Sequence, residues 1–570
     1  MSRYASSVVA LVALTSATAA DAVQYVTPAP LAKSVTTPVG NVQPSPVQVP
    51  VITWGGDIAT VHANGNAAVT TANSVFGKLG LQLRLVREDV FSKQLEAYLA
   101  GRSPYLRGTM GMINMAAEAA ERDPRTKPVV IYQMTWSAGG DALVVGSNIR
   151  AVKDLRGKSI AVQAFGPHVD YLTKILADGG LTTRDVILKW VPDLTGTSNS
   201  PAAAMRAKEV DAAFVIIPDA MALTSNGTVG TGAEDSVKGA RILLSTKTAN
   251  RIIADVYAVR SDYLASNRES VERFVRGLIE GEAALRALVT DKGTRAGEYK
   301  AAMAAAAKLL LDSEQAIADA EGMYGDAQFV RAAGNVAFFA DAKNPRRMDQ
   351  LNNEIQQSFI GLGLLSQRVA LAGTPFDFAR LGGGSAQAAA PEASRFNQGE
   401  VAGIVAKRQS QGRLSEGELF SFEVQFKPNQ DKFPAELYED AFKRVVQLAA
   451  TYGGAVITVE GHSDPLGYLR AKKDGASQVV LGRTQQSAKN LSVARALGVR
   501  DSVIAFARTQ GITLDQTQFA VVGHGIAQPK TGVCGADPCA PKSEQEWLSN
   551  MRVEFRVIQI EAEASAFRPL

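Results

Sequence analysis

Histidine and cysteine are scarce in this chain, and charge of neither sign dominates it. Only four His and two Cys occur among 570 residues, and the formal net charge is +4. The histidines are His62, His168, His462 and His524. They are scattered without the spacing of metal ligands, so the sequence predicts no metal site. The small net charge and the lack of a basic run argue against nucleic acid as a partner.

Motifs that carry enzyme chemistry are also missing. The sequence has no nucleophile elbow, no phosphate-binding loop, no zinc signature and no dinucleotide fingerprint. We therefore expect neither an enzymatic activity nor a cofactor. Hydrophobic residues make up 46% of the chain and charged residues 20%, which is typical of folded globular domains. The length predicts two to four such domains.

One apolar stretch lies at the N-terminus. Arg3 provides a short basic start, residues 4–20 carry no charge, and Ala17-Thr18-Ala19 matches a cleavage signal. This pattern predicts a secretory signal peptide over residues 1–22 and hence export. The alternative is an uncleaved membrane anchor, although the stretch is short and rich in small residues for a span of about 20 apolar residues. No Cys follows it, so a lipid anchor is not expected.

The two cysteines lie close together, at Cys534 and Cys539. Gly535 and Pro538 between them favour a tight turn that would bring the two sulfur atoms together. In an oxidising periplasm we expect a disulfide that closes a small loop. Two free thiols are the alternative.

Composition divides the remaining chain into two parts. Residues 23–50 are rich in Pro, Val and Thr without periodicity, which predicts a linker. Residues 376–413 contain the glycine-rich run 382–385 and predict a second, flexible linker. Two folded parts are expected, at 51–375 and 414–562.

Strand and helix signals alternate in the first part. Short apolar runs typical of strands occur at 51–54, 81–86, 129–132, 142–145, 159–162, 186–190 and 210–216. Helices are expected between them, for example at 169–178 and 201–208, and from 268 to 365 the signal is almost entirely helical. The pattern predicts an α/β fold with mostly parallel sheets.

Three phrases of this part carry a family resemblance. They are VKDLRGKSIAV at 152–162, Phe165-Gly-Pro-His168, and AMRAKEVDAA at 204–213. The chain here resembles periplasmic solute-binding proteins of the nitrate, sulfonate and thiamine-precursor type, although Lys208 stands where that family usually has Gly. The resemblance implies a two-lobed fold, a small-molecule solute and an inner-membrane ABC transporter as partner.

Such a fold binds its solute between the lobes, where strands end and helix N-termini present free N–H groups. On that basis we nominate a set of solute-binding residues. They are Trp54, Gly55, Gly56, Asp57, Trp136, Ser137, Phe165, Gly166 and His168. Core packing is the alternative for the tryptophans and helix capping for Asp57 and His168. The class of solute stays open, and the domain could instead be a scaffold that docks a protein.

The second part predicts an α+β domain. Strands are expected at 419–426, 455–459, 519–522 and 553–558, and helices at 435–450 and 487–509. Five phrases in this part occur in a recognisable order. They are Phe426–Asn429 (FKPN), Glu460–Gly467 (EGHSDPLG), Leu491–Val499 (LSVARALGV), Gly523–Pro529 (GHGIAQP) and Asn550–Glu554 (NMRVE). Together they resemble the OmpA-like peptidoglycan-binding domain. The resemblance implies attachment to the cell wall in the periplasm and association with the outer membrane.

The same resemblance assigns the ligand contacts. The diaminopimelate of the peptidoglycan stem carries an ammonium and a carboxylate on one carbon, which an acidic and a guanidinium side chain can clamp. Asp464 would take the ammonium, Arg495 the carboxylate, and Asn429 would add a polar contact. Residues 469–487 look like an inserted loop, and Arg483 within it is a rival to Arg495. Two functions stay open: a solute receptor kept at the wall, or a structural or motor-accessory envelope protein.

Overall fold

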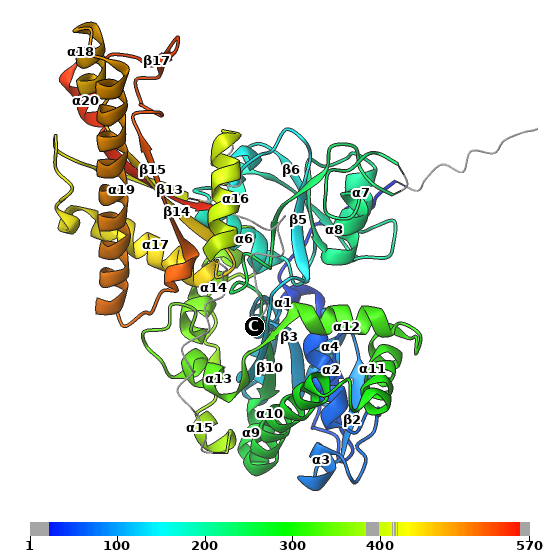
Figure 1. Ribbon diagram of the computed structural model, residues 1–570. Helices are drawn as coiled ribbons and strands as arrows, with labels where there is room; N and C mark the ends of the chain where they lie inside the picture. The colour runs from blue at the N-terminus through cyan, green and yellow to red at the C-terminus, as the bar shows by residue number, and fades with distance from the viewer. Residues whose placement is uncertain are drawn as a thin grey trace, which may run out of the picture.

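A computed structural model describes residues 22–558 apart from 234, 384–397, 413, 415–417 and 419. The predicted signal peptide, up to residue 21, and the centre of the second predicted linker lie outside the described residues. Among the described residues, no helix has the length and apolar character needed to cross a membrane. Figure 1 shows two lobes stacked one above the other, with the C-terminal domain beside them.

Lobe 1 combines a mixed sheet of order β11-β4-β10-β3 with a parallel pair, β1 and β2. Its strands are β1 (Val47–Val51), β2 (Leu83–Arg87), β3 (Tyr105–Thr109), β4 (Pro128–Ser137), β10 (Ala254–Arg260), β11 (Ala327–Phe329) and β12 (Ala372–Gly373). Its first helices are α2 (Gly55–Ala63), α3 (Val75–Lys78), α4 (Phe91–Leu99) and α5 (Met110–Ala120).

Lobe 2 is built on a five-stranded sheet of order β7-β6-β8-β5-β9. Its strands are β5 (Asp141–Val145), β6 (Ser159–Gln163), β7 (Ile187–Val191), β8 (Ala212–Ile216) and β9 (Arg241–Ser245). Its helices are α6 (Val169–Asp178), α7 (Pro201–Arg206) and α8 (Ile217–Leu223). Helix α6 has the predicted bounds because its apolar residues recur with helical period.

The prediction of mostly parallel sheets was wrong. Strand β10 is antiparallel to both β3 and β4, and β5 is antiparallel to both β8 and β9. The reason is that the chain crosses between the lobes twice. It leaves lobe 1 along β4 into β5 and returns along β9 into β10, so neighbouring strands on the two crossings run in opposite directions.

The predicted helical region follows the return to lobe 1. Its helices are α9 (Ser261–Ser266), α10 (Arg268–Thr290), α11 (Ala296–Leu311), α12 (Ile317–Asp326), α13 (Arg331–Phe339) and α14 (Met348–Leu362). Helix α14 packs against α5 of lobe 1, where Ile355 and Phe359 are buried with Ile113. The short strand β11 between α12 and α13 was not predicted.

Both predicted linkers are partly folded, so their predicted boundaries were wrong. In the first, α1 (Leu31–Ser34) buries Leu31 against lobe 1, and Val26 donates a backbone hydrogen bond to Trp190 of lobe 2. In the second, α15 (Phe378–Leu381) packs into the core of lobe 1. Apolar residues among the Pro, Gly and polar residues supply enough burial to order these segments.

The C-terminal domain has a four-stranded sheet of order β13-β18-β14-β15. Strands β14 and β15 are parallel, and the other pairs are antiparallel. The strands are β13 (Phe420–Gln425), β14 (Val456–His462), β15 (Phe519–Gly525) and β18 (Arg552–Ile558). The helices are α16 (Gln398–Ser410), α17 (Glu439–Thr451), α18 (Leu466–Lys473), α19 (Gln478–Thr509) and α20 (Glu544–Ser549).

Two predictions about this domain have clear outcomes. The disulfide between Cys534 and Cys539 is confirmed, with its sulfur atoms 2.06 Å apart; Cys534 ends the short strand β16 (Val533–Cys534), and Cys539 directly follows its partner strand β17 (Asp537–Pro538). The prediction of an inserted loop at 469–487 was wrong, because helix α18 and the start of helix α19 occupy most of these residues. Ala, Leu, Lys and Gln in this stretch favour helix.

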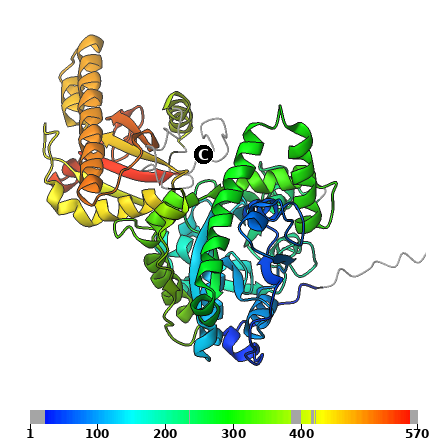
Figure 2. The ribbon, with the colours of Figure 1, turned by 90° about the horizontal axis from the view of Figure 1, so that it is seen from below.

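The C-terminal domain is joined to lobe 2 by direct packing. The hydroxyl of Tyr452 donates to Asp178 Oδ2 over 2.9 Å, and Arg444 forms an ion pair with Asp178 at 3.0 Å. One apolar cluster runs from Leu172 on α6 to Phe442 on α17 without a break. Figure 2 shows this domain against one side of the lobes. A cavity of about 840 Å³ lies at the same junction, between α6, α14 and α17.

Candidate functional site

Asp57, predicted as a solute ligand, belongs to a buried ion network in lobe 1. Its Oδ2 lies 2.8 Å from Nη2 of Arg107, and Nη1 of Arg107 lies 3.0 Å from Oδ1 of Asp255. Asp57 and Arg107 are fully buried. Asp57 lies in the first turn of α2, where the helix dipole also favours a carboxylate. Asp57 therefore serves as a counter-ion for the buried guanidinium of Arg107.

Trp54 joins the same network. Its indole Nε1–H donates to Thr135 Oγ1 over 2.9 Å, and Thr135 Oγ1 donates to Asp255 Oδ2 over 3.1 Å. The neighbouring Gly55 is required by packing, since a Cβ there would lie 1.8 Å from the carbonyl oxygen of Met323 on α12. Gly56 is also buried, against Thr135.

A second buried network brings together two predicted residues, Ser137 and His168. Ser137 Oγ donates to Asp141 Oδ2 over 2.6 Å, and His168 Nε2 lies 2.7 Å from Asp141 Oδ1. Thr246 completes the set, 2.9 Å from Ser137 Oγ. His168 is fully buried, and its Nδ1 has no hydrogen-bond partner. Asp141 and Thr246 were missed because no sequence signal sets them apart from other polar residues at strand ends.

Trp136, Phe165 and Gly166 occupy structural positions at the lobe junction. Trp136 is 6% exposed and packs edge-on against Phe338. Phe165 has a φ of 60°, a left-handed conformation that costs free energy in a non-glycine residue, and it packs on the apolar cluster of lobe 1. A Cβ at Gly166 would lie 2.0 Å from Gln163 Oε1. Core packing thus accounts for Trp136.

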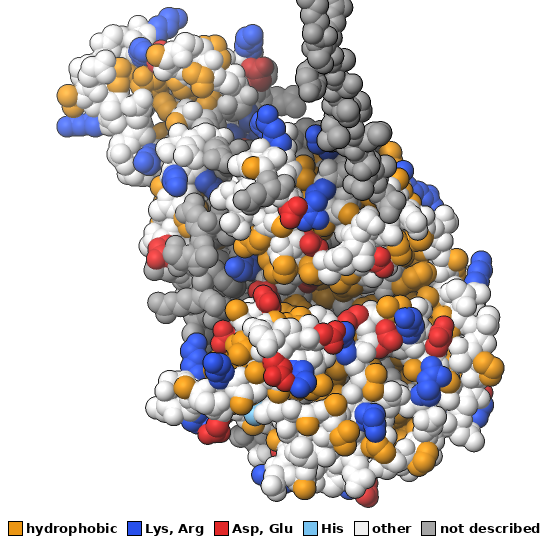
Figure 3. All heavy atoms as spheres, turned by 90° about the vertical axis from the view of Figure 1, so that its right-hand side faces the viewer, with side chains coloured by type: hydrophobic (Ala, Val, Ile, Leu, Met, Phe, Trp, Pro, Cys, Tyr) orange, Lys and Arg blue, Asp and Glu red, His pale blue; other side chains and the backbone are white. Residues whose placement is uncertain are grey.

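Buried carboxyl groups accumulate where the two lobes meet. Burial raises the pKa of Asp255, and the charge of Asp141 adds to this rise; the charge of Asp255 in turn adds to the effect of burial on Asp170. Burial raises the pKa of Asp170 to about 7, and its Oδ2 has no hydrogen-bond partner. Figure 3 shows a hollow between the lobes, floored by hydrophobic side chains, with acidic and some basic side chains along its lower edge.

We expect Asp170→Asn to change how stability depends on pH. The pKa of Asp170 is raised to about 7, so between about pH 4 and 7 the folded protein holds a proton that the unfolded chain has lost. Stability of the wild type therefore falls as pH rises through this window. The variant lacks this loss, and its unfolding free energy should exceed that of wild type by on the order of 2 kcal/mol at pH 8.

Urea unfolding at pH 5 and pH 8 measures this difference. The exposed Asp235→Asn is the matched control and should follow the wild type at both pH values. Parallel pH curves for Asp170→Asn and wild type would contradict the expectation.

In the C-terminal domain, the three residues predicted to contact peptidoglycan come together at one end of the sheet. Arg495, on α19, donates from Nε to the carbonyl of Gln430 over 2.8 Å, and from Nη2 to that of Lys427 over 3.2 Å. Its Nη1 donates to the carbonyl of His462, at the end of β14, over 3.2 Å. The loop that carries Asn429 is thereby tied to the strand end that precedes Asp464.

The exposure of these side chains differs. Arg495 is fully buried, and burial lowers its pKa to about 10, whereas Asn429 is exposed with a left-handed φ of 55°. Asp464 is half-buried, and burial raises its pKa. Its Oδ2 accepts the N–H of Leu466 over 2.9 Å, whereas Oδ1 has no hydrogen bond of good geometry. The side chains of Trp547 and Asn550 lie close enough to the carboxylate to lower its pKa and so offset part of the effect of burial. Arg483, the rival arginine, is exposed and lies on α19 about 18 Å along the helix axis from Arg495.

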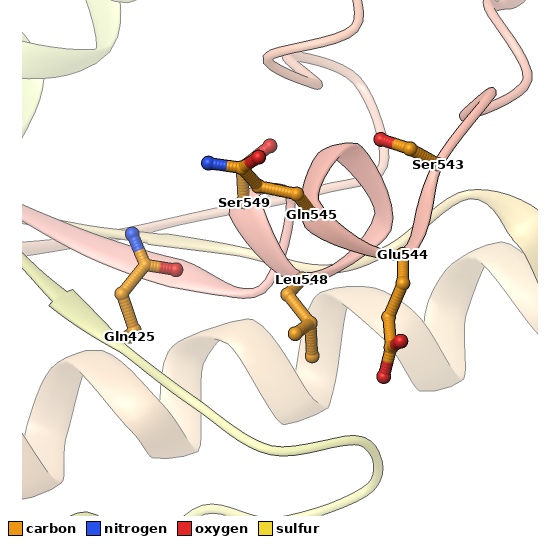
Figure 4. Close-up of a pocket in the computed structure, with 6 residues that line it drawn as sticks. All are labelled: Gln425, Ser543, Glu544, Gln545, Leu548 and Ser549. Carbon is orange, nitrogen blue, oxygen red and sulfur yellow. The ribbon is translucent and has the colours of Figure 1, made fainter.

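An open pocket of about 610 Å³ lies next to this site (Figure 4). Gln425, the last residue of β13, forms one wall, and α20 forms the other with Glu544 and Leu548. The remaining lining residues are Ser543, Gln545 and Ser549. Neither this pocket nor the cavity at the junction of α6, α14 and α17 contains any of the nine predicted solute-binding residues.

Comparison with known proteins bears mainly on the lobes. Residues 76–291 match the family model described as NMT1/THI5 like. No curated protein matches the chain. Among solved structures, the periplasmic aliphatic sulphonate-binding protein SsuA of Escherichia coli is 17% identical, with 57% of this chain and 90% of that chain covered and a TM-score of 0.41.

Two further structures are similar over different parts. The alkanesulfonate-binding protein SsuA of Xanthomonas axonopodis pv. citri, bound to MOPS, is 18% identical over 58% of this chain and 100% of that chain, with a TM-score of 0.39. The peptidoglycan-associated lipoprotein of Burkholderia pseudomallei is 17% identical over 24% of this chain and 88% of that chain, with a TM-score of 0.17. The N-terminal part of the chain is a two-lobed α/β domain, and the matched residues 76–291 lie within it.

Proposed function

We propose that this chain is an exported envelope protein that holds peptidoglycan through its C-terminal domain and a small solute through its lobes. It would work in the periplasm, attached to the cell wall. The observation that carries the wall-binding part is the position of Arg495. Its hydrogen bonds join the loop that carries Asn429 to the end of β14, which precedes Asp464, and the pocket of Figure 4 begins at Gln425, close to that loop in sequence.

The roles of these side chains follow from their surroundings. Asp464 Oδ1, which has no hydrogen bond of good geometry, would accept the ammonium of diaminopimelate. The positive charge of Arg495 favours a carboxylate nearby, although its burial means that direct contact requires the loop of Lys427 to Gln430 to move. Asn429 is exposed and can contact the ligand without such a movement.

Sedimentation with purified sacculi tests the wall-binding part. The complete protein should pellet with sacculi that contain diaminopimelate and remain in the supernatant without them. Because Phe442 and Tyr452 pack on lobe 2, the experiment uses the complete protein and not the isolated C-terminal domain. A protein that stays soluble in both samples would overturn this part of the proposal.

The solute part rests on two buried polar atoms without partners at the start of α6, Nδ1 of His168 and Oδ2 of Asp170. Buried polar groups normally find a partner, and a bound solute would supply one here. Since carboxyl groups gather at this junction, we expect a solute that carries a positively charged group. The lobes would then deliver this solute to an inner-membrane transporter.

A second candidate, a docking scaffold, is favoured by apolar packing between the lobes. Val169 of lobe 2 is buried in the same cluster as Met110 and Trp136 of lobe 1, and Phe165 packs against it. Native mass spectrometry of protein purified gently from periplasm distinguishes the two candidates. We expect an added mass that is released on unfolding and is lost in Asp170→Ala. An unliganded wild-type protein would favour the scaffold.

A further inference from the structure

Three buried side chains converge on the face of the C-terminal sheet that is turned away from α19. Glu460 and His462 lie two residues apart on β14, so their side chains share a face. Gly461 between them faces Ser492 of α19 on the opposite side. His524 enters from the neighbouring strand β15, and one ligand-type atom from each of Glu460, His462 and His524 lies within 4.8 Å of the others.

The ring of His462 has one nitrogen bound and one free. Its Nδ1 lies 3.1 Å from the carbonyl oxygen of Gln528, so Nδ1 carries the proton and donates it. Nε2 is then left with a lone pair. It is buried and has no hydrogen-bond partner, although Glu554 Oε1 lies 3.9 Å away. An unpaired polar atom inside a protein costs free energy, which a bound cation would recover.

His524 is held in a similar way. Its Nε2 lies 3.0 Å from Glu460 Oε2, and its Nδ1 lies 3.2 Å from the side-chain amide of Gln409 on α16. If that amide turns by 180°, its oxygen accepts the Nδ1 proton and Nε2 gains a lone pair. Both rings would then carry a lone pair on Nε2, each with an acceptor on its other nitrogen, as histidine ligands of metals have. The rings are stacked, with centroids 4.7 Å apart and planes 16° apart, so they would turn to direct both lone pairs at one ion.

The charges on this face are nearly balanced. Burial and then the charge of Arg552 lower the pKa of His462, which keeps its ring neutral and its lone pair available. The ion pairs among the described residues of this face join four carboxylates to three basic side chains, which leaves one negative charge in excess. The carboxylates are Glu418, Glu423, Glu460 and Glu554, and the basic residues are Lys530, Arg552 and Arg556. Arg552 and Arg556 both form ion pairs with Glu554, which fix the positions of their guanidinium groups.

We propose that Glu460, His462 and His524 bind a divalent transition-metal ion of the zinc type. Two imidazole nitrogens and one carboxylate form a ligand set that zinc sites use, with a fourth position for water or another ligand. The ion would link β14 to β15 and, through Gln409, hold α16 over the sheet. This site was not predicted, because Glu460 and His524 are 64 residues apart and have no metal-ligand spacing.

The experiment uses the complete protein after chelator treatment, titrated with Zn²⁺ and with Co²⁺ as a spectroscopic probe. We expect one equivalent bound per chain, the visible absorption of tetrahedral Co²⁺, and a higher unfolding temperature with Zn²⁺. His524→Phe should weaken Zn²⁺ binding at least tenfold. Gln409→Ala, which removes only an orienting contact, should weaken it about tenfold. His62→Ala also removes a histidine, but on α2, and should bind as the wild type does.

Three outcomes would contradict the proposed metal site. If the wild type binds neither Zn²⁺ nor Co²⁺ at micromolar concentration, or if His524→Phe binds as tightly as wild type, the proposal is wrong. Should His524→Phe fail to fold, the Gln409→Ala titration and the Co²⁺ spectrum of the wild type decide the question. Equal losses in His62→Ala and Gln409→Ala would also overturn the proposal, because they would place the ion elsewhere.

Discussion

Protein that carries Asp464→Ala is expected to stay in the supernatant when sacculi are pelleted, whereas the wild type sediments with them. The substitution removes the carboxylate oxygen that has no hydrogen bond of good geometry within the protein, Oδ1. A charge-assisted hydrogen bond to the ligand ammonium contributes about 2–3 kcal/mol, so affinity should fall roughly 30- to 140-fold. The dissociation constant follows from the bound fraction over a series of sacculi concentrations.

The control for this variant keeps the change of charge and moves its position. Asp474→Ala removes an exposed carboxylate at the end of α18 and should bind as the wild type does. Arg495→Lys should lose binding and stability together, because the single nitrogen of Lys cannot replace the three nitrogens with which Arg495 reaches three separate carbonyls. If Asp464→Ala pellets like the wild type, Asp464 is not a ligand residue.

The second large effect is expected in lobe 1, where Arg107→Met should lower the free energy of unfolding by about 3–5 kcal/mol. Arg107 is fully buried and pairs with both Asp57 and Asp255. Its removal leaves two carboxylates inside the lobe without a counter-charge. The urea midpoint at pH 8, followed by tryptophan fluorescence, should fall accordingly.

Two further measurements identify the cause of this loss. At pH 5 the deficit should shrink, because protonation of Asp57 and Asp255 removes the unpaired charges. Adding Asp57→Asn and Asp255→Asn to Arg107→Met should recover part of the stability at pH 8. Arg102→Met, at an exposed position five residues earlier, should leave the midpoint unchanged. An Arg107→Met midpoint equal to that of the wild type would show that the network contributes no stability.

Local patterns predicted the elements of this fold better than their pairing. Helix α6 has its predicted bounds, and Phe519 begins the predicted strand β15. Periodicity speaks only of neighbours in sequence, so it could not show that β10 returns from lobe 2 to pair with β3 and β4. Composition likewise missed the apolar residues that anchor the segments predicted as linkers, such as Leu31 in the first and Phe378 in the second.

The candidate sites show the same limit. Trp54, Asp57, Ser137 and His168 were predicted as solute-binding residues because they follow or end predicted strands, and they lie near the lobe junction. The partners that define their roles were missed, because Arg107 is 50 residues from Asp57 and 148 from Asp255. In the C-terminal domain, ordered motifs named Asn429, Asp464 and Arg495, whose backbone neighbourhoods the structure brings together, but a motif carries no information about burial.

Because Tyr452 and Phe442 pack on lobe 2, the two lobes are expected to move differently when the protein opens and closes. Lobe 2 and the C-terminal domain share one apolar cluster and the hydrogen bond of Tyr452 to Asp178, whereas lobe 1 meets lobe 2 in a separate cluster around Val169. We expect an opening about the crossing strands β4 and β10 to separate this second cluster and to move lobe 1 relative to the other two parts. In the wall-attached state that we propose, lobe 2 would stay in place and lobe 1 would move, so a partner that senses the closed state would have to contact lobe 1.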